Sequence, residues 1–353
     1  MVNNKKNYNT NNVKKNKKKS YNTNNILIIF CIIIIIYLVI SNIKKGYKNY
    51  EGFNNKKEIF IVTSMLGRNF ASRIKNEMLK LNPNVNILVK NVKELVVWCK
   101  GKTKYPDLIL VRSATPLDTK WINCIKQMEE KGIPVINPTS ILQLTSNKLK
   151  SSLHLMKQNI PHPYSAEGKK NDNNTLNKIK KLFLKYDMLI LKPFTSSSQG
   201  AYVQKINKNM SDEEIKSKIN LIPTSPFVIQ EFIDYVALYR VIVINNKALP
   251  LSYRDAPTKD KWKVSVCLNP NMTFVSNPPK ELLKTGEMVQ RAIFNGGVHF
   301  IDLFETKDKN NKYVVSEINT ACSLLLHERM AREANHTHHN IAHYIGKYYL
   351  SLL

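Results

Sequence analysis

The sequence predicts an α/β protein that follows an apolar N-terminal segment, with a C-terminal part of mixed α+β character. The first observation behind this prediction is an alternation of short β-branched runs with helical stretches between residues 58 and 138. The second is a longer region after residue 160 in which strand-like runs dominate. The third is an uninterrupted apolar run at residues 26–40.

Composition allows a packed core but gives little information about partners. The chain has 353 residues, of which 43% are hydrophobic, enough for two or three layers of structure. Its formal charge of +28 comes largely from lysines in Asn-rich stretches, so it is weak evidence for a nucleic-acid partner. The five cysteines have no CxxC motif or framework spacing, which predicts neither a zinc site nor a disulfide scaffold and favours a reducing compartment.

The first 57 residues are predicted to be an anchor. Residues 1–25 hold seven lysines and no acidic residue, which predicts a disordered basic tail. Residues 26–43 include ILIIFCIIIIIYLVI and as a helix would be about 27 Å long, near the thickness of a thin bilayer, so we expect a transmembrane helix. Residues 44–57 would be a linker. A buried core segment and a cleaved signal peptide are the alternatives, but no small-x-small cleavage site follows Ile40.

The orientation of such an anchor stays open. Seven lysines precede the apolar run and three (Lys44, Lys45 and Lys48) lie between it and Glu51, which by the positive-inside rule predicts a translocated C-terminal part. Four N-x-S/T sequons are present, but these arise easily in an Asn-rich chain. The basic tail could also bind anionic lipid or nucleic acid, at about 1 kcal/mol per lysine near an anionic surface.

Residues 58–143 predict a parallel sheet with helices between its strands. The predicted strands are EIFIVTS, VNILVKN, DLILVRS and IPVINP, and the predicted helices cover residues 69–81 and 118–131. Residues 144–353 would form the second domain. It begins with helices within residues 140–158 and a proline-marked linker, IPHPYS, and ends with a hairpin and a helix over residues 324–353. Its other predicted strands are MLILKPF, AYVQKI, PFVIQEFI, YRVIVI and KALPLSYR.

The most informative segment is HFIDLFETKDKNNKYVVSEIN, which predicts a β-hairpin. A turn centred between residues 309 and 310 places Asp302 opposite Glu317, with Asn319 on the same face. Two facing carboxylates repel each other and call for a cation between them, and an all-oxygen ligand set suits Mg²⁺. The alternative is that both carboxylates are solvated edge residues.

Three further features indicate a nucleotide. Lys192 ends a buried strand, where its charge needs an anionic partner such as phosphate. The hydroxyl-rich turn at residues 195–200 could cover phosphates with its backbone N–H groups, although alone it could equally be a linker. Glu231 and the backbone after it could bind an adenine edge, although a glutamate at this place in a strand is otherwise ordinary.

Taken in this order, these pieces resemble the ATP-grasp superfamily, nearest to the glutathione synthetase and ribosomal-protein glutamate ligase (RimK-type) group. The resemblance covers roughly residues 58–350. It implies an ATP-grasp fold with an N-terminal Rossmann-like pre-ATP-grasp domain, here preceded by the transmembrane helix. The matched stretches are VINPTSILQLTSNKLKSSLHLMKQNIPHP, LILKPFTSSSQGAYV, FVIQEFI, YRVIVINNKALPLSYR and the Asp302, Glu317, Asn319 triad.

The resemblance also implies a role for each matched position. Two lysines would contact the α- and β-phosphates, one loop would close over the triphosphate, and three side chains would bind Mg²⁺ or Mn²⁺. The implied nucleotide-binding residues are Lys148, Lys192, Ser196, Ser198, Gln199, Gly200, Glu231 and Ile233; the implied metal ligands are Asp302, Glu317 and Asn319; the implied catalytic arginines, near the reacting carboxylate, are Arg240 and Arg254.

The activity that the resemblance implies is an ATP- and Mg²⁺-dependent carboxylate–amine ligase that works through an acyl phosphate. Its partners would be ATP, a small-molecule or peptide carboxylate and amine, and a membrane, rather than nucleic acid. We expect a single-pass membrane protein with its catalytic domain on the ATP-containing side. Departures from the family pattern at Asn147, Leu238 and residues 320–323 support an alternative, a catalytically silent ATP-binding membrane scaffold or regulator.

Overall fold

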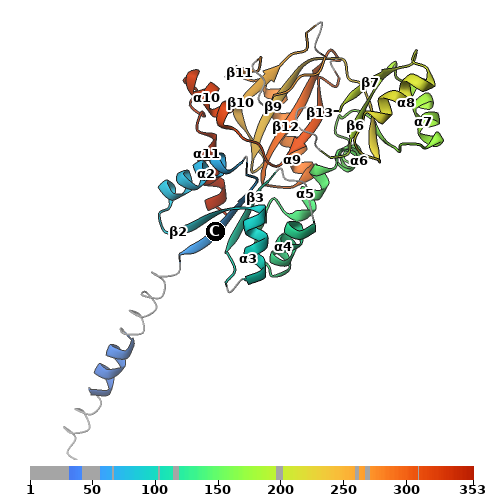
Figure 1. Ribbon diagram of the computed structural model, residues 1–353. Helices are drawn as coiled ribbons and strands as arrows, with labels where there is room; N and C mark the ends of the chain where they lie inside the picture. The colour runs from blue at the N-terminus through green and yellow to red at the C-terminus, as the bar shows by residue number, and fades with distance from the viewer. Residues whose placement is uncertain are drawn as a thin grey trace, which may run out of the picture. The chain divides into compact units, whose positions relative to one another are not determined.

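A computed structural model describes residues 32–41, 56–65, 67–101, 104–113, 119–195, 202–258, 262–266, 271–308 and 310–353 (Figure 1). The chain separates into two compact units, residues 1–56 and residues 57–353. The predicted basic tail and most of the predicted linker lie outside the described residues.

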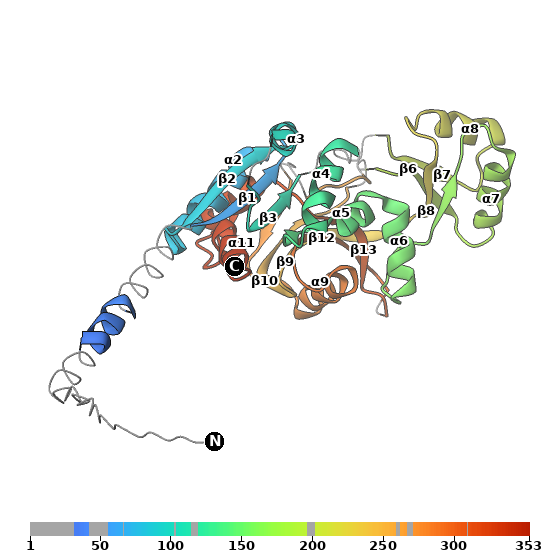
Figure 2. The ribbon, with the colours of Figure 1, turned by 90° about the horizontal axis from the view of Figure 1, so that it is seen from below.

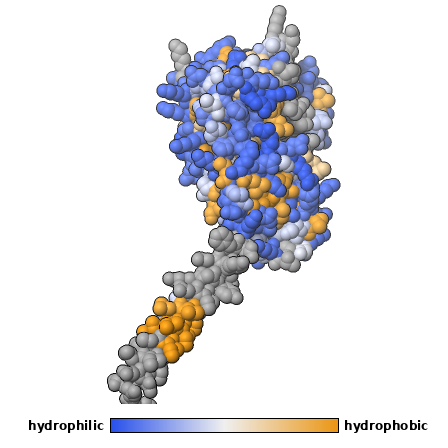
Figure 3. All heavy atoms as spheres, turned by 90° about the vertical axis from the view of Figure 1, so that its left-hand side faces the viewer, coloured by the Kyte–Doolittle hydropathy of each residue, from blue (hydrophilic) through white to orange (hydrophobic). Residues whose placement is uncertain are grey.

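In the first unit, residues 32–41 form a helix. Its large apolar side chains are between 47% and 72% exposed, and on the face seen in Figure 3 they form a hydrophobic surface. Among the described residues, no helix combines the length and the apolarity that crossing a membrane requires. The predicted transmembrane helix at 26–43 is therefore not confirmed, and its two ends lie outside the described part of the chain.

The second unit begins with the predicted parallel sheet, in strand order β2-β1-β3-β4. Successive side chains of β1 alternate between two buried faces. Ile59 and Ile61 pack towards α2, while Phe60 and Val62 pack towards α3 and α4. Burial on both sides explains why this strand is continuously apolar. The elements are β1 Lys57–Thr63, α2 Arg68–Leu81, β2 Val85–Asn91, α3 Val92–Gly101, β3 Leu108–Arg112, α4 Thr119–Glu130 and β4 Val135–Ile136.

Cys99 and Cys124 form a disulfide between α3 and α4, with Cα atoms 6.2 Å apart. The cysteine spacing predicted no disulfide scaffold, so it gave no indication of this bridge. The pairing does not follow from spacing along the chain. It arises because the two helices pack side by side on one face of the parallel sheet, as Figure 1 also shows.

A large antiparallel sheet follows, in strand order β11-β10-β9-β12-β13. Helix α9 covers one face closely, because Gly286 has no side chain: a Cβ atom there would lie 2.9 Å from Val241 Cγ1. The other face shares a hydrophobic core with α2 and α11 (Figure 2). The elements are β9 Tyr235–Ile244, β10 Lys247–Asp255, β11 Thr273–Val275, α9 Lys280–Ile293, β12 Val298–Thr306 and β13 Tyr313–Asn319.

The predicted C-terminal helix over 324–353 is in fact two helices, α10 Leu325–Glu333 and α11 Ile341–Leu350. The break has a local cause. Asn335 adopts a positive φ of 52°, a conformation that asparagine tolerates and that ends a helix. The break turns the chain so that α11 packs on α2, where Gly346 lies against Met78.

A small antiparallel sheet, in strand order β5-β8-β6-β7, forms a lobe at one end of the second unit (Figures 1 and 2). Leu189 and Leu191 of β6 pack against α7 and α8, so alternation directs Ile190 and Lys192 to the opposite face. Helices α5 and α6 precede the lobe. The elements are α5 Thr139–Ser146, α6 Lys148–Lys157, β5 Ser165–Gly168, α7 Asn173–Phe183, β6 Met188–Pro193, β7 Gln204–Asn207, α8 Asp212–Asn220 and β8 Phe227–Glu231.

Candidate active site

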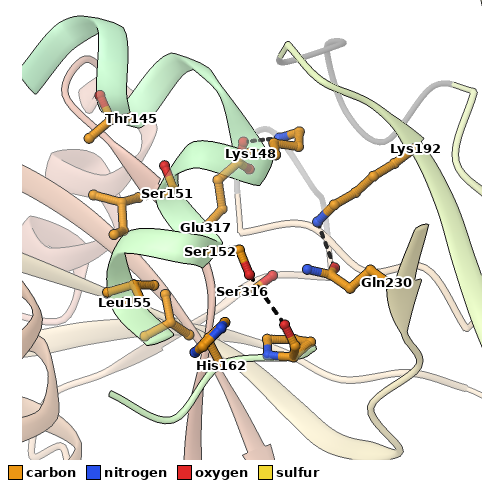
Figure 4. Close-up of a pocket in the computed structure, with 13 residues that line it drawn as sticks. Thr145, Lys148, Ser151, Ser152, Leu155, His162, Lys192, Gln230, Ser316 and Glu317 are labelled. Carbon is orange, nitrogen blue, oxygen red and sulfur yellow. Dashed lines mark hydrogen bonds and ion pairs between the residues drawn. The ribbon is translucent and has the colours of Figure 1, made fainter. Parts of the chain in front are cut away.

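A pocket lies where α6, the small sheet and the β12–β13 hairpin meet (Figure 4). Its lining includes Lys148, Lys192, Gln230 and Glu317. Two of the predicted phosphate-binding residues and one predicted metal ligand are thus gathered in one pocket, although they are far apart in the sequence.

Lys148 is the first residue of α6 and is positioned by the start of that helix. The side chain of Asn147 caps the helix by accepting a hydrogen bond from the Lys150 backbone N–H at 2.9 Å. The Lys148 ammonium forms an ion pair with Glu317 Oε1, as Figure 4 shows. Asn147, a departure from the family pattern, therefore still performs the capping role.

Lys192 reaches the pocket from β6. Its Nζ donates a hydrogen bond to Gln230 Oε1 at 2.6 Å, and Gln230 Nε2 donates to Ser165 Oγ at 2.8 Å. Protein atoms crowd the ammonium even though the side chain is partly exposed. This burial and, to a smaller extent, the Lys148 charge lower the pKa of Lys192 to about 7, and Glu317 opposes the shift. A bound phosphate would restore the protonated form.

The hairpin has the predicted register at the site: Asp302 pairs with Glu317, and Phe300 pairs with Asn319. Nearer the turn the register shifts, because Leu303 pairs with Val315. The shift leaves Ser316 as an extra residue in the ladder, which is a β-bulge. Asp302, Glu317 and Asn319 consequently share the face of the sheet on which Arg240 lies.

Asp302 is held by Arg240, its register partner on β9. The Nε–Oδ1 and Nη2–Oδ2 distances are both 2.8 Å, and both residues are 5% exposed. Burial raises the pKa of Asp302, Glu317 adds to this effect, and Arg240 opposes it. Arg240 Nη1 also donates to Cys322 Sγ at 3.0 Å, which ties the pair to the segment after β13.

The predicted metal ligands fit Mg²⁺ by donor type and by register, since two carboxylates and an amide oxygen come from one face of a hairpin. Both carboxylates already have a cationic partner. A bound ion would have to take Glu317 from Lys148 and share Asp302 with Arg240. In the described part of the chain, no group of three or more His, Cys, Asp or Glu side chains could hold a metal.

The structure does not bring the two predicted catalytic arginines together. Arg254 pairs with Tyr239, the neighbour of Arg240, and therefore lies on the opposite face of the large sheet. Its guanidinium is 5.9 Å from the centre of the Tyr239 ring. A direct role for both arginines at one carboxylate is therefore at odds with the geometry.

The predicted adenine-binding residues lie at the end of β8 and just after it, and follow Gln230, which lines the pocket. Glu231 Oε2 accepts a hydrogen bond from the Tyr164 backbone N–H at 3.1 Å, and the Glu231 N–H donates to the Tyr164 carbonyl at 2.9 Å. Neither Glu231 nor Ile233 is among the described residues that line the pocket. The predicted phosphate-covering residues Ser196, Ser198, Gln199 and Gly200 lie outside the described residues.

Sequence reasoning missed Arg112, which ends β3. Its Nη2 donates to the Cys322 carbonyl at 3.2 Å, so it joins the parallel sheet to the segment that Arg240 also contacts. A signal was present, because a charged residue directly after the apolar run of DLILVRS marks the carboxyl end of a parallel strand, where α/β proteins place ligands.

No family model and no curated protein sequence matches the chain. Several solved structures, however, match it. D-alanine–D-alanine ligase from Bacillus anthracis, complexed with ATP, is 18% identical with a TM-score of 0.59, over 85% of this chain and 98% of that one. The ATP-grasp ligase PsnB, complexed with a minimal precursor, is 14% identical with a TM-score of 0.60, over 84% and 100%. D-cycloserine synthetase DcsG is 11% identical with a TM-score of 0.60, over 82% and 99%.

These matches span almost the whole length of each ligase, and at such low identity they establish the fold. The second unit has the mixed α/β fold of ATP-grasp ligases, and the predicted superfamily likeness is confirmed at that level. They do not test the narrower likeness to glutathione synthetase and ribosomal-protein glutamate ligases.

Proposed function

We propose that residues 57–353 bind ATP with Mg²⁺ and join a carboxylate to an amine. The observation that carries this proposal is the meeting of Lys148, Lys192 and Glu317 in one pocket between the two antiparallel sheets of an ATP-grasp fold. Two ammonium groups and a carboxylate are the groups that a metal–triphosphate needs, because catalysis of phosphoryl transfer depends mainly on positioning and charge neutralisation.

The contacts of these residues suggest how they act. A triphosphate would replace Gln230 as the partner of Lys192 and would replace Glu317 as the partner of Lys148. Glu317 would then be released to hold Mg²⁺ together with Asp302 and Asn319. Arg240 would keep Asp302 in a fixed orientation, since it grips both carboxylate oxygens. The metal ion, when bound, would offset the charge that develops on the phosphates.

The proposed reaction has two steps. A substrate carboxylate oxygen attacks the γ-phosphorus, and ADP leaves, which gives an acyl phosphate. The amine nitrogen then attacks the acyl carbon and loses a proton, and inorganic phosphate leaves as the amide forms. We propose an amino acid, a peptide or a protein side chain as the carboxylate, in keeping with the resemblance to glutathione synthetase and the glutamate ligases and with the D-alanine ligase and peptide-precursor ligase of the same fold.

A second candidate function is a catalytically silent ATP-binding module. The observation that favours it is that both predicted metal-binding carboxylates are already neutralised by the chain, Asp302 by Arg240 and Glu317 by Lys148. A site that satisfies its own carboxylates could bind nucleotide and still turn it over poorly.

The test is an ATP-consumption screen of purified residues 50–353 against amino-acid pairs, glutathione precursors and acidic peptides. We expect ADP and phosphate with one substrate pair. Lys192→Ala and Asp302→Ala should abolish turnover, and Lys181→Ala, an exposed lysine on α7, should not change it. Turnover that survives both site changes would exclude this site. Tight ATP binding without ADP across the screen would favour the silent module.

We further propose that the N-terminal apolar segment attaches the protein to a membrane, with the ligase unit on the ATP-containing side. The exposed apolar side chains of residues 32–40 support this, because a helix that is apolar all round is unfavourable in water. The full chain should resist alkaline extraction from membranes, and a chain without residues 1–43 should be released. Protease protection of the ligase unit would determine its side. Release of the full chain by alkali would exclude the anchor.

A further inference from the structure

Arg112 is a buried arginine between the parallel sheet and the large antiparallel sheet. It is 4% exposed. Its guanidinium carbon lies 5.2 Å from the centre of the Phe70 ring on α2 and 5.4 Å from the centre of the Phe300 ring on β12. The rings hold the guanidinium in place from two sides but cannot neutralise its charge.

Among the residues that the structure describes, this charge has no acidic partner. Arg112 Nη1 is buried and has no hydrogen-bond partner. The buried Tyr349 hydroxyl also lies beside the guanidinium, but it is neutral, and among the described carboxylates none lies within ion-pair distance. Arg240 is a matched comparison: it is about as buried as Arg112, but its Nε and Nη2 donate hydrogen bonds to the carboxylate of Asp302. A buried cation without an anion is unfavourable, so an unpaired one is expected to be retained for a ligand.

Arg112 lies beside the proposed catalytic face. Phe300, which contacts its guanidinium, is the register partner of Asn319, and Asp302 lies two residues further along the same face of β12. Arg112 and Arg240 also bond the same residue, the former through the Cys322 carbonyl and the latter through Cys322 Sγ. The unpaired guanidinium is therefore next to the metal-binding end of the hairpin.

The chemistry of the unsatisfied atoms identifies the ligand class. Arg112 Nη1 and Asn319 Nδ2 are both donors, and both are buried without a partner. A planar group that only accepts hydrogen bonds and carries a negative charge satisfies such donors, and guanidinium groups match carboxylates in geometry. Cys322, whose carbonyl Arg112 contacts, is partly exposed, and the next residue, Ser323, is exposed, so this segment separates the guanidinium from the surface.

We propose that Arg112 binds a carboxylate group of the substrate at the junction of β3, β12 and the segment after β13. This inference rests on the proposed ligase function and deepens it, because it makes a free carboxylate on an amino acid or peptide the feature that the site recognises. Arg112 is a substrate-binding residue contributed by the parallel sheet, whereas the proposed nucleotide residues come from α6 and the antiparallel sheets.

The direct test measures carboxylate binding without nucleotide. The full chain is titrated with N-acetylglycine and, separately, with its uncharged analogue N-acetylglycinamide, by ligand-observed NMR. Arg112→Met removes the charge but keeps an apolar chain between the rings. Arg112→Lys keeps the charge but loses the planar guanidinium that can form two parallel hydrogen bonds to a carboxylate. The control, Arg68→Met, removes an exposed arginine on α2. We expect affinity for N-acetylglycine to fall roughly tenfold or more in Arg112→Met, less in Arg112→Lys, and not in Arg68→Met.

Equal binding by the wild type and Arg112→Met would overturn the proposal, as would no binding of N-acetylglycine to the wild type, or equal binding of the uncharged analogue. A thermal readout separates a binding role from a structural one. Removal of an uncompensated charge should leave the Tm of the unliganded protein unchanged or raised, and N-acetylglycine should raise the Tm of the wild type and of Arg68→Met but not that of Arg112→Met. A lower Tm for Arg112→Met with unchanged binding would mean that the arginine is structural.

Kinetics distinguishes failure of this inference from failure of the proposed function. With an active substrate pair, Arg112→Met should raise KM for the carboxylate substrate about tenfold and leave KM for ATP unchanged. Turnover with both constants unchanged would overturn the carboxylate site and leave the ligase standing. If carboxylate binding depends on Arg112 but the protein never forms ADP, the carboxylate site is supported and the proposed ligase function is excluded.

Discussion

Arg240 and Asp302 face each other across β9 and β12, joined by two hydrogen bonds of 2.8 Å each. Both side chains are almost completely buried. The pair fixes the orientation of a predicted metal ligand, and it also makes the stability of the large sheet depend on residues of the site.

Arg240→Met should destabilise the protein strongly, because it leaves the Asp302 carboxylate buried without its cation. Breaking one partner of a buried pair costs about 3–5 kcal/mol in the free energy of unfolding. Urea denaturation followed by circular dichroism measures this loss.

The matched control for that change is the double variant Arg240→Met/Asp302→Leu, in which no charge remains and most of the lost stability should return. The single variant should also gain stability as the pH falls, because burial raises the pKa of Asp302 above its unfolded value and the fold then binds the proton more tightly. A single variant as stable as the wild type at neutral pH would contradict the assigned role.

Lys192 should make nucleotide binding depend on pH. Its pKa is lowered from 10.5 to about 7, so above pH 7 the free protein carries a neutral amine that must take up a proton to bind phosphate. Affinity for ADP should fall as the pH rises from 7 to 9, with proton uptake on binding. Calorimetry in buffers of different ionisation enthalpy measures this uptake.

Lys192→Arg should remove that dependence, since a guanidinium stays charged over this range. In the protein without nucleotide, the pH dependence of stability has the opposite sign to the pH dependence of ADP binding. The folded state binds its proton less tightly than the unfolded state, so the contribution of Lys192 to the free energy of unfolding improves as the pH rises from 7 towards 10.5. Binding of ADP without proton uptake at pH 8 would show that Lys192 does not contact the phosphates.

Glu317→Gln should separate metal binding from nucleotide binding. The change removes one predicted metal ligand and releases the Lys148 ammonium from its ion pair. We expect the Mg²⁺ concentration for half-maximal turnover to rise about tenfold or more, while ADP binding without metal stays equal or tightens. Glu281→Gln, an exposed change on α9, is the control. An unchanged Mg²⁺ requirement would exclude Glu317 as a ligand.

Reduction of the Cys99–Cys124 disulfide should destabilise the parallel sheet and its helices. The bridge closes a loop with a sequence separation of 25 residues, for which the chain-entropy model gives about 3.5 kcal/mol. Denaturation with and without reductant measures the difference. The double variant Cys99→Ser/Cys124→Ser should match the reduced protein and be insensitive to reductant, and two titratable thiols at these positions in the non-reduced protein would contradict the pairing.

Much of the fold could be predicted because local pattern determines it. The apolar run around Ile59 and Ile61 predicts a strand buried on both faces, and the turn residues of the last hairpin place Asp302 opposite Glu317. The turn is one residue shorter than the predicted one. The extra residue at the bulge, Ser316, offsets this difference, so Asp302 still pairs with Glu317.

What could not be predicted depends on which elements pack together. Arg254 is on the wrong face because its orientation follows from its pairing with Tyr239, which no local pattern reveals. The partner of Cys99 follows from the packing of α3 on α4, and α3 itself was missed because it begins directly where β2 ends, without a turn. Arg112 becomes a site residue only when β12 is placed over the end of β3.

The hydrogen bonds around Lys192 all run in one direction. Lys192 donates to Gln230, Gln230 donates to Ser165, and Ser165 Oγ donates to the Pro163 carbonyl at 3.1 Å. Because a backbone carbonyl can only accept, the final link sets the orientation of the amide before it. The Gln230 amide is thereby fixed with its oxygen towards the pocket, where it attracts cations and repels a phosphate. A phosphate is therefore accepted there only when the Lys192 ammonium lies between it and the Gln230 oxygen.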